Sequence, residues 1–103
     1  MARFNELSAP LIIKELGLRY KSYRIEMEMT QKELSERTGV SVQTIRRFEN
    51  GESGSLVFAN FIELLRAAGL VNNLDGTLPE LPISAAVLAA LDHKKKQRVR
   101  HGK

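Results

Sequence analysis

The stretch TQKELSERTGVSVQTIRRFENG, residues 30–51, carries the signals of two short helices joined by a tight turn. Thr30 and Glu33 have the spacing of a capping box, which begins a helix. Gly39 ends that helix, because glycine tolerates the left-handed backbone of a helix end. Ser41 then caps a second helix. Two short helices with a brief junction around a glycine predict a helix-turn-helix.

The apolar positions of the same stretch fit this motif. Leu34 anchors the first helix, and Val40 fills the corner between the two helices. Ile45 and Phe48, three residues apart, seat the second helix on the core. Ser35 supplies a small residue where the two helices cross. These residue types at fixed spacing, between two capped helix starts, form a specific pattern.

The chain before this stretch predicts one longer helix. Ser8 is its expected cap, and Pro10 lies in its first turn. Apolar side chains recur at gaps of three and four along one helix face, at Ile13, Leu16, Tyr20, Tyr23 and Met27. A second stripe is left to pack on later segments or on a partner, and it consists of Leu11, Leu18 and Ile25.

After a polar loop, a further helix is expected from Ser55, its cap, to Gly69. Its inward face is predicted to hold Phe58, Phe61, Ile62 and Leu65, with Val57 and Leu64 widening the stripe. A helical turn before Pro79 and a last helix capped by Ser84 follow. The predicted fold class is all-α, a compact domain of five or six short helices with a basic tail. The expected divisions are a loose leader at 1–9, a helix-turn-helix domain at 10–71 and an extension at 72–103.

Charge is placed unevenly along the chain. The 103 residues have a net charge of +4, but residues 93–103 hold six cations and no acid. Residues 1–92 contain ten basic and twelve acidic residues, a net charge of −2. A nucleic-acid surface on the body must therefore come from local placement of cations.

Composition argues against several other classes of protein. Without cysteine there is neither a disulfide nor a thiolate metal site, which fits a cytoplasmic location. No apolar run approaches the span of about 18 residues that a membrane helix needs, and the N-terminus lacks the order of a signal peptide. His93 and His101 have no neighbouring ligands, so no metal is expected. The sequence GESGS at 51–55 lacks the lysine of a phosphate loop, so neither a cofactor nor catalysis is expected.

Residues 15–70 resemble the Xre/Cro/CI family of bacterial and phage repressor domains, with Met29 in place of a leucine and Ser35 in place of an alanine. The resemblance implies a lambda-repressor-like fold and sequence-specific DNA binding. The continuation GSLVFANFIELLRAAGLVNNLDGTLPE, with the basic ending KKKQRVR, is similar to HipB-like antitoxins, the partners of HipA-type kinase toxins. This second resemblance implies a toxin–antitoxin operon.

A recognition helix lies in the major groove with its N-terminal residues at the base edges. Gln43 suits adenine and Arg47 suits guanine, each pair giving about 1–3 kcal/mol of discrimination. Val42 and the methyl group of Thr44 suit thymine methyl groups. Arg46 points about 100° away from Arg47 on a regular helix, so we assign it to phosphates. The alternative is that both arginines are merely solvated.

Contacts with the DNA backbone are expected from groups near helix starts and in the loop that follows. The predicted set is Gln31, Ser41, Arg46, Asn50 and Ser53. The resemblance implies that Gln31 both contacts a phosphate and braces the recognition helix. Ser55 is better explained by capping alone. The resemblance further implies an ion pair between Arg24 and Glu49 that aligns the first helix with the recognition helix.

The basic tail admits three uses: contact with DNA phosphates, docking on an acidic partner, or a solvated end. Its cations are Lys94, Lys95, Lys96, Arg98, Arg100 and Lys103.

The expected function is that of a homodimeric repressor on double-stranded, palindromic operator DNA. The expected dimer surface draws on Leu64, Leu70, Val71, Leu74 and Leu78. By resemblance, a HipA-like kinase toxin or a third toxin–antitoxin component is a further partner. The alternative is a protein-interaction module that ignores DNA. Gln43, Arg46 and Arg47 argue against that module, because interface cores are depleted in charge.

Overall fold

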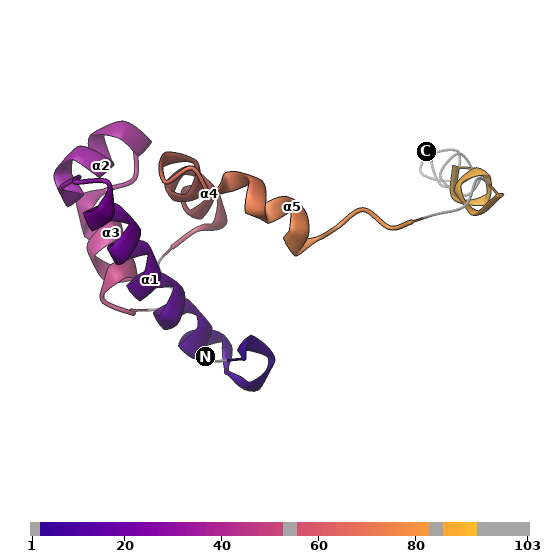
Figure 1. The fold of residues 1–103 in the computed structure, drawn as a ribbon, viewed down its shortest axis with the longest axis horizontal. Coiled ribbons are helices and arrows are strands. Elements are labelled where there is room, and N and C mark those ends of the chain that lie inside the picture. Colours follow the sequence, from indigo (N-terminus) through magenta and orange to yellow (C-terminus); the bar gives the residue numbers. More distant parts are fainter. Residues whose placement is uncertain (1–2, 53–55, 83–85, 93–103) are drawn as a thin grey trace, which may run out of the picture.

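The computed structural model describes residues 3–52, 56–82 and 86–92, and every regular element in these ranges is helical (Figure 1). Residues 86–92 form a helical segment near the C-terminus. The prediction of an all-α helix-turn-helix fold is therefore confirmed. The elements before that segment, in chain order, are the 3-10 turn η1 (Phe4–Glu6), α1 (Ala9–Glu26), α2 (Gln31–Thr38), α3 (Val42–Glu49), α4 (Phe58–Ala67), the 3-10 turn η2 (Val71–Asn73) and α5 (Leu74–Thr77).

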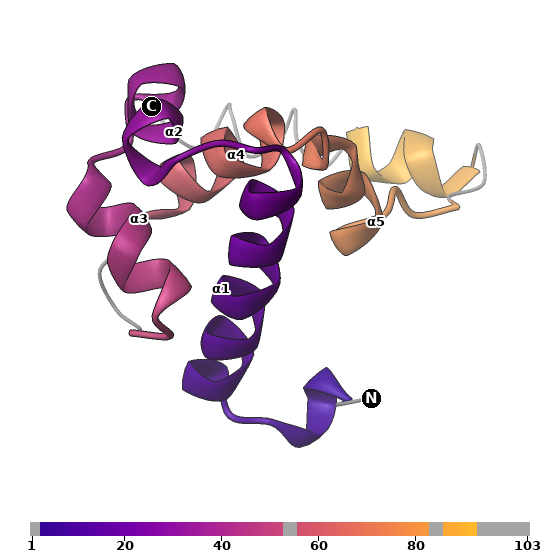
Figure 2. The same ribbon diagram turned by 60° about the vertical axis from the view of Figure 1, so that its left-hand side comes forward.

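The helices pack around one small core. α3 contacts both α1 and α2, while α2 also contacts α4. Figure 2 shows α1 running lengthwise between α3 on one side and α5 on the other. The fully buried apolar side chains come from four helices and one turn, and they are Tyr20, Leu34, Val40, Ile45, Phe48 and Leu64.

The local signals around the helix-turn-helix act as predicted. The Thr30 side chain accepts from the Glu33 N–H at 3.0 Å, and the Glu33 carboxylate accepts from the Thr30 N–H at 2.9 Å. The latter bond lowers the pKa of Glu33. Gly39 adopts a left-handed φ of 80° at the end of α2. The Ser41 hydroxyl accepts from the Thr44 N–H at 3.1 Å and so caps α3.

Gly17 allows α1 and α3 to approach closely. A Cβ atom built at this position would lie only 1.8 Å from the main-chain oxygen of Phe48. Backbone atoms cannot yield as a flexible side-chain end can, so any larger residue would push the two helices apart. The sequence analysis did not single out this glycine.

Tyr20 joins α1 to the end of α4. Its hydroxyl donates to the Leu64 carbonyl oxygen at 2.8 Å, and its ring lies 5.9 Å from that of Phe48. Phe48 in turn meets Phe61 edge-on at 5.9 Å. Burial of the phenol, reinforced by the nearby Glu49 carboxylate, raises the pKa of Tyr20 to about 12.

The predicted face of α4 was wrong in part, although Phe61 packs against the core as expected. Leu64, expected to widen the stripe and to contribute to a dimer surface, is fully buried in the core. Phe58 is 66% exposed and Val57 is also exposed. α4 begins at Phe58 rather than directly after Ser55, and its cap residue Val57 makes no side-chain bond. The periodicity identified the helix, but the neighbour that covers it, α2, decided which side turns inward.

Two expectations for the N-terminal part also need correction. Tyr23 was expected in the core but is exposed. The leader is not loose throughout, because η1 forms within it and the guanidinium of Arg19 lies 5.2 Å above the Phe4 ring, a cation–π geometry. Ser8 occupies the cap position of α1 without a side-chain cap bond. The helical turns before Pro79 are present as η2 and α5, whereas Ser84 lies outside the described residues.

Replacing Gly17 with alanine should destabilise the domain by about 1–3 kcal/mol or more, because the added methyl group meets the Phe48 carbonyl. Gly76→Ala is the matched control, since nothing lies within 4 Å of its built Cβ atom. Urea unfolding monitored by circular dichroism measures both. Equal stability of the two variants would contradict the close approach of α1 and α3.

The two tyrosines allow Tyr20 to be titrated alone. In a Tyr23→Phe variant, phenolate absorbance should rise only near pH 12, because folding raises the pKa of Tyr20 to that value. A pKa raised on folding stabilises the protein below the unfolded value of about 10. This contribution should therefore be lost between about pH 10 and pH 12. Ionisation of a folded chain near pH 10 would refute the buried hydrogen bond.

Candidate nucleic-acid interface

α3 has one face locked into the domain and one face turned outward. Ile45, Phe48 and Glu49 are buried, whereas Gln43, Arg46 and Arg47 are exposed. This separation follows from the helical period, which repeats an inward position every three or four residues. The side chains of Gln43 and Arg47, which are predicted to contact bases, are therefore open to a ligand in this structure.

The first turn of α3 is held by two bonds of Ser41. Besides capping the Thr44 N–H, the Ser41 hydroxyl donates to the Thr44 hydroxyl at 2.8 Å. Val42 and Thr44 are half-buried at this end of the helix. Because the Thr44 hydroxyl already accepts a hydrogen bond within the turn, its methyl group is the part left for an apolar contact.

Glu49 is the centre of a charged network at the inner side of α3. Its side chain is only 1% exposed, and Arg24 of α1, at 11%, covers it. The Arg24 guanidinium donates to both carboxylate oxygens, at 2.8 and 2.9 Å. This fork geometry is the strongest form of a charged hydrogen bond. The bond to Glu49 also raises the pKa of Arg24 further.

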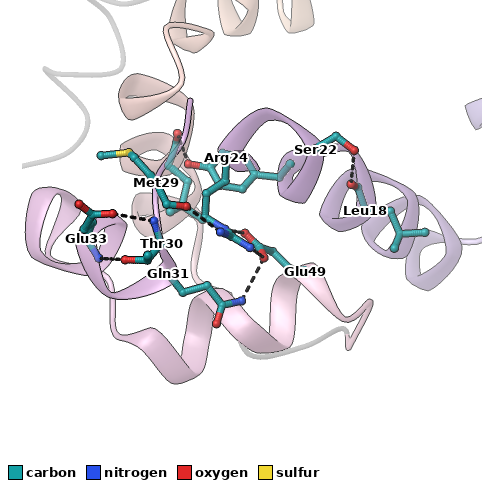
Figure 3. A network of polar contacts seen from close by, with 10 residues as sticks. Leu18, Ser22, Arg24, Met29, Thr30, Gln31, Glu33 and Glu49 are labelled. Carbon is teal, nitrogen blue, oxygen red and sulfur yellow. Dashed lines mark hydrogen bonds and ion pairs between the residues drawn. The ribbon is translucent and has the colours of Figure 1, made fainter. Parts of the chain in front are cut away.

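Two further bonds extend this network, as Figure 3 shows. The Gln31 side-chain N–H at the start of α2 donates to the Glu49 carboxylate at 3.0 Å. The remaining Arg24 nitrogen donates to the main-chain oxygen of Met29, in the turn between α1 and α2, at 2.7 Å. Within the described residues, no buried side-chain nitrogen or oxygen lacks a partner. The network therefore ties α1, the following turn and α2 to the recognition helix.

The structure brings together some of the predicted site residues and leaves others apart. Arg24, Gln31 and Glu49 form one cluster. Asn50 is exposed at the end of α3, which it caps through its main chain. Ser53 and the tail cations from Lys94 onward fall outside the described residues.

Sequence reasoning missed two groups that support this site. The Met29 carbonyl accepts from Arg24, yet a main-chain acceptor leaves no trace in the residue type. Gly17 sets the distance between α1 and α3. A glycine inside an otherwise regular helical pattern was the available signal, because glycine costs about 1 kcal/mol there relative to alanine.

The described residues contain no group of three or more potential metal ligands. None of the described helices is long and apolar enough to cross a membrane.

Residues 21–70 match the helix-turn-helix family model, which covers α2, α3, α4 and most of the network around Glu49. This part of the chain is similar to that family, and it contains the two helices, α2 and α3, that form the helix-turn-helix in the structure. No curated protein matches the chain significantly.

Substituting Glu49→Gln should destabilise the fold by about 3–5 kcal/mol, because the Arg24 guanidinium would remain buried without its counter-charge. Glu15→Gln is the control: it breaks the 2.8 Å pair with Arg19, which is well exposed, and should cost less than about 1 kcal/mol. Chemical denaturation of both variants makes the comparison. If both substitutions reduced the stability only slightly, the buried ion pair between Arg24 and Glu49 would not be what holds α3 in place.

Proposed function

We propose that the chain is a sequence-specific DNA-binding repressor that reads the major groove with α3. The observation that carries the proposal is the exposure of Gln43 and Arg47 on a helix whose opposite face is fixed by Glu49. A helix held in this way presents its outer side chains at a constant orientation. That constancy is what two-point hydrogen bonds to base edges require.

The base contacts follow from the exposed face. Gln43 pairs with an adenine and Arg47 with a guanine. Val42 and the Thr44 methyl group meet thymine methyl groups. Both residues are half-buried at the start of α3, beside the exposed Gln43.

The backbone contacts are proposed at the rim of the recognition helix. Arg46 binds phosphate from its exposed position, and Ser41, Asn50 and Ser53 complete this set. Gln31 already donates its side-chain N–H to Glu49. Its phosphate contact uses the main-chain N–H at the start of α2 or the second N–H of the side-chain amide. The divisions at 1–9, 10–71 and 72–103 are part of the same proposal, with the middle part holding DNA.

The repressor is proposed to act as a homodimer on a palindromic operator, whose half-sites are about one helical turn apart. We place it in a HipB-like setting, repressing its own operon beside a HipA-like kinase toxin. This setting is supported by the sequence resemblance over residues 54–80 and the basic ending. In this setting the tail cations bind DNA phosphates or an acidic partner.

Arg47 and Arg46 provide a paired test of base recognition. Arg47→Ala should cost about 1–3 kcal/mol and relax the preference at one base position. Arg46→Ala should weaken binding to all sequences alike and reduce the salt slope by about 1. Arg66→Ala, an exposed arginine of α4, should change neither quantity. Selection from random DNA followed by fluorescence anisotropy at several salt concentrations measures all three.

The same titration distinguishes the repressor from a pure protein-interaction module. Preferential binding to a selected sequence, falling steeply with salt, supports the repressor. Equal binding to selected and random DNA would favour the module and exclude sequence recognition by α3.

A further inference from the structure

An apolar groove of about 480 Å³ opens between α1, α4 and α5. Its walls include Tyr23 from α1, Phe58 and Leu65 from α4, and Leu74 from α5. Among the residues that the structure describes, Arg19 is the one charged residue that lines it. Protein interiors are normally close-packed, and an open apolar hollow of this size marks a binding site.

The same chain carries an apolar segment outside the body. We define the C-terminal arm as residues 78–82 together with the helical residues 86–92, which follow directly after α5. Leu78 is 86% exposed and Leu81 is 75% exposed, and Leu88 and Leu91 are exposed as well. Figure 1 shows the arm running out from α5, with its helical end far from α1 to α4. The Cα radius of gyration, 18.8 Å, exceeds the value of about 13 Å that is typical of a compact chain of this length.

The groove and the arm match in chemistry. The groove offers aromatic and aliphatic walls with a single cationic residue. The arm offers four leucines, no basic residue, and the carboxylate of Glu80. Docking the arm in the groove would remove both apolar surfaces from water.

The position of the arm indicates whether it fills the groove of its own chain or the groove of another copy. Pro79 and Pro82 each restrict their own backbone, and each biases the preceding leucine toward an extended conformation. In this structure the helical end of the arm lies far from α1 and α4, which line the groove of its own chain (Figure 1). We propose that the arm of one copy occupies the groove of a second copy, and that the second copy returns the contact.

Such an exchange makes an isologous, two-fold dimer from one type of contact. Because each contact occurs twice, both arms contribute to the buried surface of the dimer. The inference deepens the proposed repressor function, on which its biological use rests, by naming the source of the dimer. It also replaces the expected dimer surface at Leu64, which is buried within one chain.

Disulfide cross-linking tests the occupant directly, because the chain has no cysteine of its own. A copy with Leu74→Cys in the groove is mixed with a longer, tagged copy with Leu88→Cys in the arm. Oxidation should join the two into a mixed dimer on a non-reducing gel. Glu36→Cys on exposed α2, mixed with the same Leu88→Cys copy, is the control and should not cross-link.

Two outcomes would overturn the exchange. A chain carrying both cysteines that closes an internal disulfide, while the mixture stays monomeric, would assign the groove to its own arm. No cross-link in either arrangement would assign the groove to a different molecule.

Sedimentation equilibrium gives an independent measure. The double variant Leu88→Glu and Leu91→Glu should weaken dimerisation on the order of a hundredfold or more, because two apolar side chains lose their burial. Leu18→Glu changes an exposed leucine of α1 that does not line the groove, and it should leave dimerisation unchanged.

DNA binding separates this inference from the proposed function. If the double variant Leu88→Glu and Leu91→Glu still formed dimers, the arm exchange would be overturned, while DNA recognition by α3 would be unaffected. Wild-type chains that cross-link arm to groove but prefer no DNA sequence would overturn the repressor and retain the exchange.

Discussion

The buried carboxylate of Glu49 is the constraint on which the arrangement of the helices depends. A carboxylate 1% exposed is stable only when its charge and its lone pairs are matched. Here the matching groups come from α1 and from α2, through Arg24 and Gln31. α3 cannot rotate or slide without leaving this charge uncompensated. The outer face, with Gln43 and Arg47, therefore keeps a fixed orientation relative to the whole domain.

Close packing supports the charged network from the other side. Gly17 lets the backbone of α3 approach α1, which brings Arg24 within reach of Glu49. Tyr20 adds a hydrogen bond to the Leu64 carbonyl and so ties α4 to the same helix. An apolar groove lies open between α1, α4 and α5. The arm after α5 carries exposed leucines of matching character, and the proposed exchange of arms accounts for both surfaces together.

The sequence alone was sufficient to predict the caps and the turn around α2 and α3, where the controlling interactions are local. The Thr30 capping box, the left-handed Gly39 and the Ser41 cap each depend on residues at most a few positions apart, and each was predicted. The inward positions of α3 followed from its period for the same reason. The partner of Arg24 was also anticipated, through a family resemblance rather than through spacing. The assignment of base and phosphate contacts remains a prediction.

Only the tertiary structure decided which surfaces meet. Periodicity placed apolar residues on α4 but could not say that Leu64 would be buried while Phe58 stayed exposed, because the covering helix is distant in sequence. The Met29 carbonyl, the requirement for Gly17 and the groove beside α5 all arise between segments that the chain brings together by folding. The sequence by itself determined the helices and the ends of α2 and α3, since caps and turns act over a few residues. The tertiary structure decided their inward faces and the open groove, since burial depends on neighbours that no local pattern contains.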